Sequence, residues 1–434
     1  MKYYLAIDLG ATSGRHIVGH LENGEIKLEE IYRFKTGMDD SSNGLVWNIP
    51  RLLEEIIKGI KLSFDKYKTI ESLSIDTWGV DYVLLNDKEE IPPFYAYRNE
   101  RCKKSSEEVH QLISFEELYK HTGIQFAAFN TIYQLFDDLK KGRLDQASDY
   151  LMLPCYFIYK LTDKKIHEYT NESTGALLNA DKGEYDFEII DKLGLPRKLF
   201  KEIHHPGYSA GKLLPEIESR VGGNTKVVLC PTHDTASAFE AVEVDEDTVI
   251  LSSGTWSLLG IKSKKPVISD ASLKANYTNE GGVNYIRLLK NIMGMWIPNM
   301  VKDEVSITQE FINKNIVNID YKVTFDVNDP SLIAPSSMKK AVLKLLEKHQ
   351  HRNDLELFSS IYHSLALSYK NAVEELENIT KRKYHKIVVI GGGANNNYLN
   401  GLIKEYSDLE VIALPIEATA LGNIKIQMKE NKKL

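Results

Sequence analysis

The fold is indicated by Tyr3-Tyr4-Leu5-Ala6-Ile7-Asp8-Leu9-Gly10-Ala11-Thr12-Ser13-Gly14-Arg15, at the start of the chain. The apolar residues, rich in β-formers, predict a buried strand that ends near Asp8. A turn rich in glycine and hydroxyl groups follows, and residues 16–19 predict a short returning strand. The glycines allow the backbone to approach a ligand closely, and successive N–H groups in such a turn can bind phosphate oxygens. The alternative is an ordinary hairpin with a polar turn.

The side chains of this stretch also suit a phosphate ligand. Thr12 and Ser13 supply hydroxyl groups and Arg15 supplies a cation. Asp8, at the carboxyl end of the strand, suits hydrated Mg²⁺, which binds through few carboxylates and keeps several waters. In the alternative interpretation, Asp8 bonds only the N–H groups of the turn, and Arg15 pairs with a surface carboxylate, which adds little stability.

Composition narrows the class of protein. A chain of 434 residues is too long for a single core and predicts two or three domains. Its 43% hydrophobic and 26% charged residues are typical of a globular protein. A net charge of -7, with no dense run of Lys and Arg, argues against a nucleic-acid partner. No apolar run reaches the roughly 18 residues of a membrane span.

Cysteine usage and the N-terminal residues suggest a compartment. Cys102, Cys155 and Cys230 lie far apart without CxxC spacing, which fits a reducing environment and no zinc site. The chain enters a predicted strand almost at once, which leaves no room for a signal peptide. We therefore expect a cytoplasmic protein, a monomer or a homodimer, without a membrane partner.

The rest of the first half predicts an α/β layer fold. A half-exposed third strand is expected at 25–32, an amphipathic helix at 51–66, and a strand at 72–76 that ends in Thr77-Trp78-Gly79-Val80-Asp81. Residues 100–200 are mixed and mostly helical, with helix pieces at 115–119, 131–140 and 156–161 and a polar turn at 171–175. A buried strand at 226–230 leads through Pro231-Thr232-His233 to Asp234, where small residues begin a helix.

The opening pattern recurs in the second half. A strand at 247–251, a hydroxyl-rich turn at 252–255 and a returning strand at 256–261 are expected, followed by a long helix at 355–379. A strand at 386–390 then leads through three glycines into a helix, and a strand at 411–415 precedes a last helix from about residue 417. We expect domains at 1–243 and 244–434, whose two turns face each other across a cleft, as ligand sites often lie at domain interfaces.

Several of these stretches together resemble the FGGY carbohydrate kinases of the actin-like ATPase superfamily, and within them the rhamnulokinases. The stretches occur in the family's order from about residue 4 to 424: Asp8-Leu9-Gly10-Ala11-Thr12-Ser13-Gly14-Arg15, Asp76-Thr77-Trp78-Gly79-Val80-Asp81, Thr232-His233-Asp234-Thr235-Ala236-Ser237-Ala238, Leu251-Ser252-Ser253-Gly254-Thr255-Trp256-Ser257, Lys290-Asn291-Ile292-Met293-Gly294 and Gly391-Gly392-Gly393-Ala394-Asn395-Asn396. A single glycine turn is weak evidence, whereas the combination is specific.

The resemblance implies an α/β protein with two RNase H-like domains flanking a central cleft that holds ATP and Mg²⁺. It implies a nucleotide site at Ala11, Thr12, Ser13, Gly14, Arg15, Thr255, Asn299, Gly391, Gly392, Gly393 and Asn396. It implies a ketose site at Gly79, His233, Asp234, Thr235 and Asn291. Asp234 matches the family's catalytic base, Asp8 is expected on the metal side, and the product implied is L-rhamnulose 1-phosphate.

Each of these residues could instead have a purely structural role. Asp234 could be the N-cap of its helix, and a lone His233 is more often a structural histidine. Trp78 and the aromatic stretch 126–133 are expected in the core, and the role of Asp81 is left open between sugar contact and holding strand ends. Arg98 and Arg101 are either an arginine pair near the sugar or solvated surface residues. The glycines at 391–393 lack GxGxxG spacing, which excludes a dinucleotide fold.

This sequence departs from the family in a few places. Asn99 stands where many relatives carry aspartate, and Asn299 where some carry glutamine. The relatives usually continue further beyond the match at 420–423 than this chain does, so we expect the stability or interface of the second half to differ. Besides an L-rhamnulose kinase, the alternatives are a kinase for another ketose, such as L-fuculose or xylulose, and an actin-like nucleotide sensor without catalysis.

Overall fold

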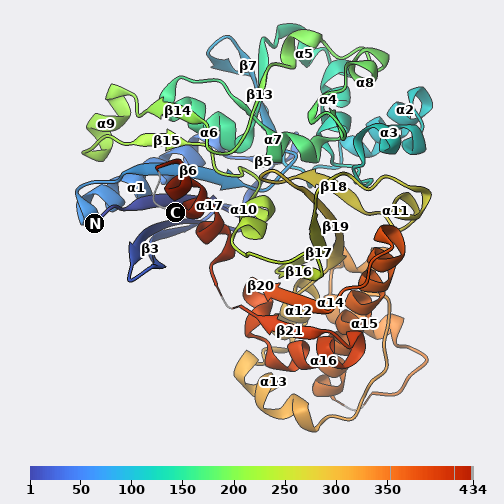
Figure 1. Ribbon diagram of the computed structural model, residues 1–434. Coiled ribbons are helices and arrows are strands. Elements are labelled where there is room, and N and C mark those ends of the chain that lie inside the picture. The colour runs from blue at the N-terminus through green and yellow to red at the C-terminus, as the bar shows by residue number, and fades with distance from the viewer. Residues whose placement is uncertain (352, 415, 432–434) are drawn as a thin grey trace.

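The computed structural model describes residues 1–351, 353–414 and 416–431. Two lobes, each built on a six-stranded sheet, lie one above the other in Figure 1. The first sheet has the order β14-β15-β6-β1-β2-β3, formed by β14 (Ser209–Lys212), β15 (Lys226–Val228), β6 (Ser72–Thr77), β1 (Tyr4–Leu9), β2 (Ser13–Glu22) and β3 (Glu25–Lys35). The central strands β1, β6 and β15 run parallel, so their carboxyl ends share one edge.

The predicted opening hairpin is present. Strand β1 is buried throughout and pairs antiparallel with β2, which places Asp8 opposite Arg15 and Leu9 opposite Gly14. A Cβ atom at Gly14 would lie 2.3 Å from the Phe34 ring of β3, so packing within the sheet itself requires this glycine.

The second sheet repeats this pattern with the order β18-β19-β17-β16-β20-β21. Its strands are β18 (Thr278–Gly281), β19 (Ile286–Met293), β17 (Trp256–Ser263), β16 (Thr248–Ser253), β20 (Lys386–Ile390) and β21 (Glu410–Ala413). Strands β16, β20 and β21 are parallel, and β16 and β17 form the second hairpin. Pro415, the last residue of the strand expected at 411–415, lies outside the described residues.

Amphipathic helices cover the sheets because their apolar residues recur on one face. In the first lobe, α1 (Ile49–Tyr67) packs its buried residues Leu52, Ile56 and Ile60 on the first sheet. In the second lobe, α15 (Asp354–Thr380) supplies much of the core. The other helices there are α11 (Asp270–Lys274), α12 (Trp296–Val305), α13 (Gln309–Asn315), α14 (Met338–Leu345) and α16 (Asn397–Ser407), with 3₁₀ turns at Ile316–Asn318, Pro330–Leu332 and Gly392–Asn395.

A long insertion extends the first lobe between its fourth and fifth strands. It contains a sheet of order β8-β7-β9 (Glu89–Glu90, Tyr82–Asn86, Asp149–Met152), and the two-stranded pairs β10 (His167–Glu168) with β13 (Ile203–His204) and β11 (Leu178–Asn179) with β12 (Glu184–Tyr185). Another pair, β4 (Met38–Ser41) with β5 (Gly44–Trp47), precedes α1. The helices of the insertion are α2 (Cys102–Leu112), α3 (Phe115–Thr122), α4 (Thr131–Lys140), α5 (Arg143–Gln146), α6 (Leu153–Thr162), α7 (Tyr169–Glu172) and α8 (Phe187–Lys192), with 3₁₀ turns at Ser173–Gly175 and Arg197–Leu199. Helix α9 (Pro215–Val221) follows β14 and leads to β15.

One local prediction is wrong in this insertion. Residues 171–175, expected as a polar turn, form the end of α7 and a 3₁₀ turn, and all five are buried. Polar residues are tolerated there because tertiary hydrogen bonds satisfy them, as when Asn171 donates to the Thr232 carbonyl at 3.1 Å.

Two helices cross between the lobes. The first half ends in α10 (Asp234–Glu240), whose Phe239 packs in a cluster with β16 and β20 of the second sheet. The chain ends in α17 (Ala418–Glu430), whose Ile424 packs with β1 and β2 of the first sheet. Figure 1 shows α17, in dark red, beside α10 and β6 in the upper lobe. The last helix thus follows the second sheet in sequence but packs on the first, and the division at 243/244 stays a prediction.

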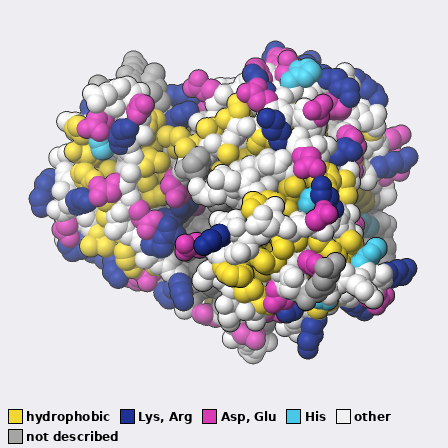
Figure 2. Space-filling view, turned by 90° about the horizontal axis from the view of Figure 1, so that it is seen from below, with side chains coloured by type: hydrophobic (Ala, Val, Ile, Leu, Met, Phe, Trp, Pro, Cys, Tyr) yellow, Lys and Arg dark blue, Asp and Glu magenta, His cyan; other side chains and the backbone are white. Residues whose placement is uncertain are grey.

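No basic patch is seen on the face of the molecule that Figure 2 shows. Lys, Arg, Asp and Glu side chains are intermingled on the face viewed in Figure 2. Of the helices in the described part of the chain, none combines the length and the apolar character that crossing a bilayer demands.

Candidate active site

Three aspartates meet at the carboxyl edge of the first sheet. Asp8 lies near the end of β1, Asp76 lies opposite it in register on parallel β6, and Asp234 follows β15. A parallel bridge between Thr77 and His233 fixes the loop after β15 against the end of β6. Since ligands of open α/β sheets bind beyond the carboxyl ends of the strands, this edge is the candidate site.

Asp76 lies at the candidate site, and the sequence reasoning did not name it as a site residue. It is fully buried, its Oδ2 accepts from Asn423 Nδ2 at 2.6 Å, and its Oδ1 has no hydrogen-bond partner among the described residues. Burial, and then the negative charge of Asp8, raises its pKa well above the ordinary value. Its place at the end of a strand that pairs with β1 was the signal that could have identified it.

Asp8 is tied to Arg15. Arg15 Nη2 lies 2.5 Å from Asp8 Oδ2, and its other terminal nitrogen pairs with Glu417 just before α17. Burial raises the pKa of Asp8 above its ordinary value. The charge of Arg15 lowers this pKa and the charge of Asp234 raises it, and the net effect is upward. The pairing of Arg15 with a carboxylate, which was the alternative interpretation, is therefore present, and its contact with a phosphate stays a prediction.

Asp234 is the accessible carboxylate of the three. It is the first residue of α10, after the N-cap residue His233, so the N-cap alternative is wrong. Its Oδ1 accepts from the backbone N–H of Thr235 at 2.5 Å and from the Thr235 hydroxyl at 3.1 Å. The side chain is 30% exposed, whereas that of Asp8 is 7% exposed. One carboxylate oxygen is thus held by its own helix, and no described residue donates to Oδ2.

A buried glutamate, also missed from the sequence, holds the loop before Asp234. Glu168 Oε2 accepts from the backbone N–H of Thr232 at 3.1 Å and from its hydroxyl, and Oε1 accepts from Thr170 N at 2.9 Å. Burial raises the pKa of Glu168. No local pattern marks this residue, because its partner Thr232 is 64 positions away in the chain.

The stretch after β6 is more structural than expected. A Cβ atom at Gly79 would lie 2.9 Å from Thr174 Oγ1, so packing already requires this glycine, and its approach to a sugar stays a prediction. Trp78 is buried, as predicted. Asp81 accepts from Trp47 Nε1 at 2.6 Å and Trp78 Nε1 at 2.9 Å, so it holds strand ends together, and whether it also contacts the sugar stays a prediction. Burial raises the pKa of Asp81 to about 6.

The arginine pair of the sequence separates in the structure. The side chain of Arg101 is 5% exposed and pairs with Asp137 and Asp138, whereas Arg98 lies over the rings of Tyr97 and Trp296. Asn99 ties its loop to the β4–β5 hairpin: its side chain donates to the carbonyls of Asn43 and Leu45 and accepts from the backbone N–H of Arg101. The core prediction for the stretch 126–133 is wrong at Phe126 and Phe129, which are 42% and 37% exposed.

The second hairpin forms the other side of the predicted site. Thr255 lies exposed in the β16–β17 turn, and its carbonyl accepts from Gly294 N and Trp296 N at 3.2 Å each. Asn291 lies half-buried on β19 opposite Leu258, and Asn299 lies exposed on α12. These contacts connect the turn to the start of α12.

The three glycines follow β20 and pack against this hairpin. Gly391 has φ +81°, and a Cβ atom at Gly393 would lie 1.9 Å from Ser253 Oγ, so both positions need glycine. A Cβ atom at Gly392 would meet open space. Asn396 caps α16 through Oδ1, which accepts from Leu399 N at 3.0 Å, while its buried Nδ2 has no partner among the described residues.

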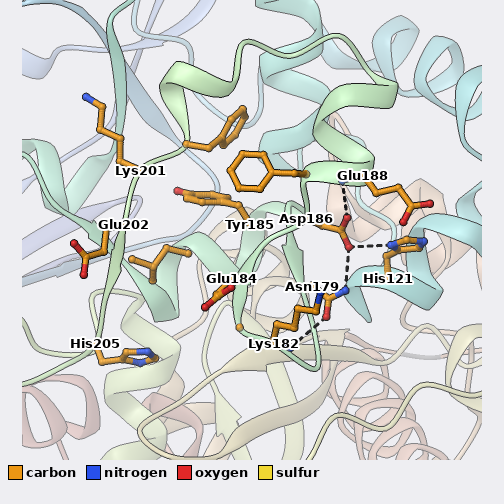
Figure 3. A pocket seen from close by; sticks show the side chains of 14 residues that line it. His121, Asn179, Lys182, Glu184, Tyr185, Asp186, Glu188, Lys201, Glu202 and His205 are labelled. Carbon is orange, nitrogen blue, oxygen red and sulfur yellow. Dashed lines mark hydrogen bonds and ion pairs between the residues drawn. The ribbon is translucent and has the colours of Figure 1, made fainter.

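The larger of the two described cavities lies elsewhere. It measures about 700 Å³ in the insertion of the first lobe, and none of the predicted site residues lines it (Figure 3). His121, Asp186 and Glu188 have potential metal-ligating atoms within 4.8 Å of one another there. Asp186, however, already accepts from His121 and Asn179 and caps α8, so these contacts are structural.

Comparison with known proteins gives the family. Residues 3–239 match the N-terminal domain of the FGGY family of carbohydrate kinases, and residues 249–430 match its C-terminal domain. The chain is 40% identical to a rhamnulokinase of Oceanobacillus iheyensis, covering 98% of this chain and 92% of the relative. Rhamnulokinases of Halalkalibacterium halodurans and Bacillus subtilis are 42% and 38% identical, with 98% of this chain covered in each case and 93% and 90% of the relatives.

Solved structures agree on the fold. A ligand-bound xylulose kinase from Lactobacillus acidophilus superimposes with a TM-score of 0.85 at 16% identity, over 100% of this chain and 90% of the other. The glycerol kinase of Plasmodium falciparum with ADP gives 0.79 at 14% identity, over 100% and 90%. These matches confirm the expected two-domain α/β fold. The chain belongs to the FGGY family of carbohydrate kinases and, within it, to the rhamnulokinases.

Proposed function

We propose that this kinase transfers the γ-phosphoryl group of ATP to the 1-hydroxyl of L-rhamnulose, giving L-rhamnulose 1-phosphate and ADP. The observation that carries the substrate is the similarity to rhamnulokinases at 38–42% identity over 98% of the chain. Identity at this level along both lobes favours this ketose over L-fuculose or xylulose. It also favours an active kinase over a nucleotide sensor.

Asp234 is the general base in this proposal. Transfer to an alcohol needs a group that takes the hydroxyl proton, while positioning and charge neutralisation supply the rest. Oδ1 of Asp234 is engaged by Thr235, which leaves Oδ2 for the substrate hydroxyl. Gly79, His233, Thr235 and Asn291 complete the ketose site. Closure of the lobes on the sugar would exclude water that otherwise hydrolyses ATP.

The nucleotide would lie between the two hairpins. The turn from Ala11 to Arg15 and Thr255 are proposed to hold the γ-phosphate through backbone N–H groups and hydroxyls. The adenosine part is proposed to rest on residues 391–393, with Asn299 and Asn396 nearby. Two observations support this placement: the open space at Gly392, and Nδ2 of Asn396, which has no partner among the described residues.

The residues present fit a magnesium ion. Asp8 and Asp76 lie side by side at the strand ends, and Oδ1 of Asp76 is buried with no partner in the described part of the chain. Carboxylate oxygens are the ligands that Mg²⁺ uses, usually through one or two carboxylates together with the phosphates and water. Bound there, the ion would neutralise charge on the transferring phosphate.

The test is ADP release from Mg-ATP with a panel of L-rhamnulose, L-fuculose and xylulose. We expect turnover with L-rhamnulose to exceed the others, and Asp234→Asn to lower kcat by roughly 10²- to 10⁴-fold, the usual contribution of a general base. Asp270→Asn is the matched control, because Asp270 is also the first residue of a helix but is exposed on α11. A different preferred ketose would overturn the substrate, and ATP binding without turnover of any sugar would favour the sensor.

A further inference from the structure

A buried arginine of the second sheet reaches the predicted sugar site. Arg287 lies on β19 and has no exposed surface. Its Nε donates to the Gly281 carbonyl at 2.8 Å, and its Nη1 lies 3.1 Å from Glu280 Oε2. Its Nη2 lies 3.1 Å from Nδ1 of His233, the residue just before Asp234. A side chain of the second lobe therefore contacts the histidine that follows the first sheet.

The chemistry of the guanidinium assigns the roles in this contact. Arginine has five N–H donors and no acceptor, and it stays protonated in proteins. Nδ1 of His233 must therefore accept through its lone pair, and the proton of the neutral ring lies on Nε2. Nε2 is 3.5 Å from Asp234 Oδ1, so the ring N–H faces the carboxylate of the proposed base.

Glu280 is the competing partner for Nδ1. Its Oε2 lies 3.4 Å from Nδ1, farther than Arg287 Nη2, and makes no hydrogen bond with it. Burial raises the pKa of Glu280, but the charge of Arg287, together with interactions with His233 and Thr278, outweighs burial and holds that pKa below the ordinary value. Glu280 thus stays a carboxylate whose role is to hold Arg287, since a buried charge needs a partner.

We propose that Arg287 is a positioning residue for phosphoryl transfer, which fixes His233 as the Nε2–H tautomer facing Asp234. This inference rests on the proposed function. Nε2 of His233 then donates to Asp234 or to a sugar hydroxyl. Because this nitrogen carries a proton, it has no lone pair for the proton of the substrate hydroxyl, and Asp234 alone takes that proton. In that step the 1-hydroxyl oxygen forms a bond to the γ-phosphorus, the bond to the oxygen of ADP breaks, and the hydroxyl proton passes to Asp234.

The tautomer is measured directly by ¹⁵N NMR of protein labelled at histidine, at about pH 8, above the ordinary histidine pKa. The signals of His233 are those that disappear in His233→Asn. We expect an unprotonated Nδ1 and a protonated Nε2 in the free enzyme. A proton on Nδ1 would overturn the proposal, and because no sugar is needed, this result is independent of which substrate the kinase uses.

Variants then separate positioning from stability. Arg287→Met alone leaves Glu280 buried without a partner and is prone to unfold, so the main variant is Arg287→Met with Glu280→Met, which removes both charges. We expect this double variant to fold and to show both His233 tautomers. Its kcat should be about 10- to 100-fold lower, with little change in the KM for ATP, because a charged hydrogen bond that orients a reacting group is lost. Arg287→Lys, which keeps the positive charge and N–H donors but loses the planar fork, should recover part of the loss.

Arg143→Met is the matched control. Arg143 is also an arginine with little exposed surface that bonds a carboxylate, Asp138, and backbone carbonyls, those of Ile91 and Pro93. We expect this variant to lose thermal stability without a change in the His233 signals or in kcat. If the double methionine variant keeps the Nε2–H tautomer and full kcat, or if the control lowers kcat equally, the positioning role is refuted.

Discussion

Replacing Gly422 with alanine should force apart the two helices that cross between the lobes. A Cβ atom at 422 would lie 1.7 Å from the Ser237 carbonyl oxygen and 3.0 Å from Ala241 N, both on the backbone at α10. Non-bonded heavy atoms need about 3.5 Å, so α17 must move by on the order of 1–2 Å. No side-chain rotation relieves this contact, because the obstacle is main chain.

The cost follows from what holds α17 in place. Ile424 is fully buried against the first sheet, and Asn423 donates to Asp76 at 2.6 Å. Overpacking costs about 1–3 kcal/mol, and weakening a hydrogen bond to a charged group costs about 1.5–3 kcal/mol. Alanine recovers about 0.5–1 kcal/mol of helix propensity. We therefore expect Gly422→Ala to lower the free energy of unfolding by about 2–5 kcal/mol, and to lower kcat through Asp76.

Gly401→Ala is the control for the same chemical change. Gly401 lies exposed in α16, where a Cβ atom would meet nothing within 4 Å. This variant should gain about 0.5–1 kcal/mol. Urea unfolding, followed by circular dichroism, measures the free energy of unfolding of both variants. Hydrogen exchange shows which of the two lobes has changed in stability. Equal stability of Gly422→Ala and the wild type, or an equal loss in Gly401→Ala, would refute the reasoning.

Three further predictions concern titration and the nucleotide. Burial lowers the pKa of His167, but hydrogen bonds with Asp149 and Glu172 raise it to about 9. The stabilisation from the protonated ring is therefore full below about pH 6.5 and is lost as the pH rises through about 9. His167→Gln should be less stable than wild type near pH 6 but not near pH 10, and an equal loss of stability at both pH values would contradict this. Burial lowers the pKa of His16 to about 4. The stability of the wild type in urea should therefore fall as the pH drops from about 6.5 to 4. An NMR signal of His16 that titrates near pH 6.5 would contradict this prediction. Gly392→Val should raise the KM for ATP about tenfold with an unchanged Tm, because a Cβ atom there meets no protein atom within 4 Å and would obstruct only the proposed nucleotide. An unchanged KM would remove this glycine from the site.

Local patterns were enough for most elements of the fold. The alternation at 25–32 and the periodicity at 51–66 predicted β3 and α1, because burial of one face is written in the order of side chains. The hairpin at 4–15 and its echo at 248–261 followed from strand residues that flank a short polar turn. The prediction of a polar turn at 171–175 was wrong, because the polar side chains there form hydrogen bonds with groups distant in the sequence.

The sequence by itself determined the strands, the two turns and the candidate residues Asp8 and Asp234, since each depends on neighbours within a few positions. Only the tertiary structure decided which distant groups meet them. Parallel register brings Asp76 beside Asp8, and strand β19 of the second sheet brings Arg287 to His233. The return of α17 to the first sheet is also tertiary. Such contacts depend on how buried charges and apolar faces find partners across the whole chain, which no local pattern records.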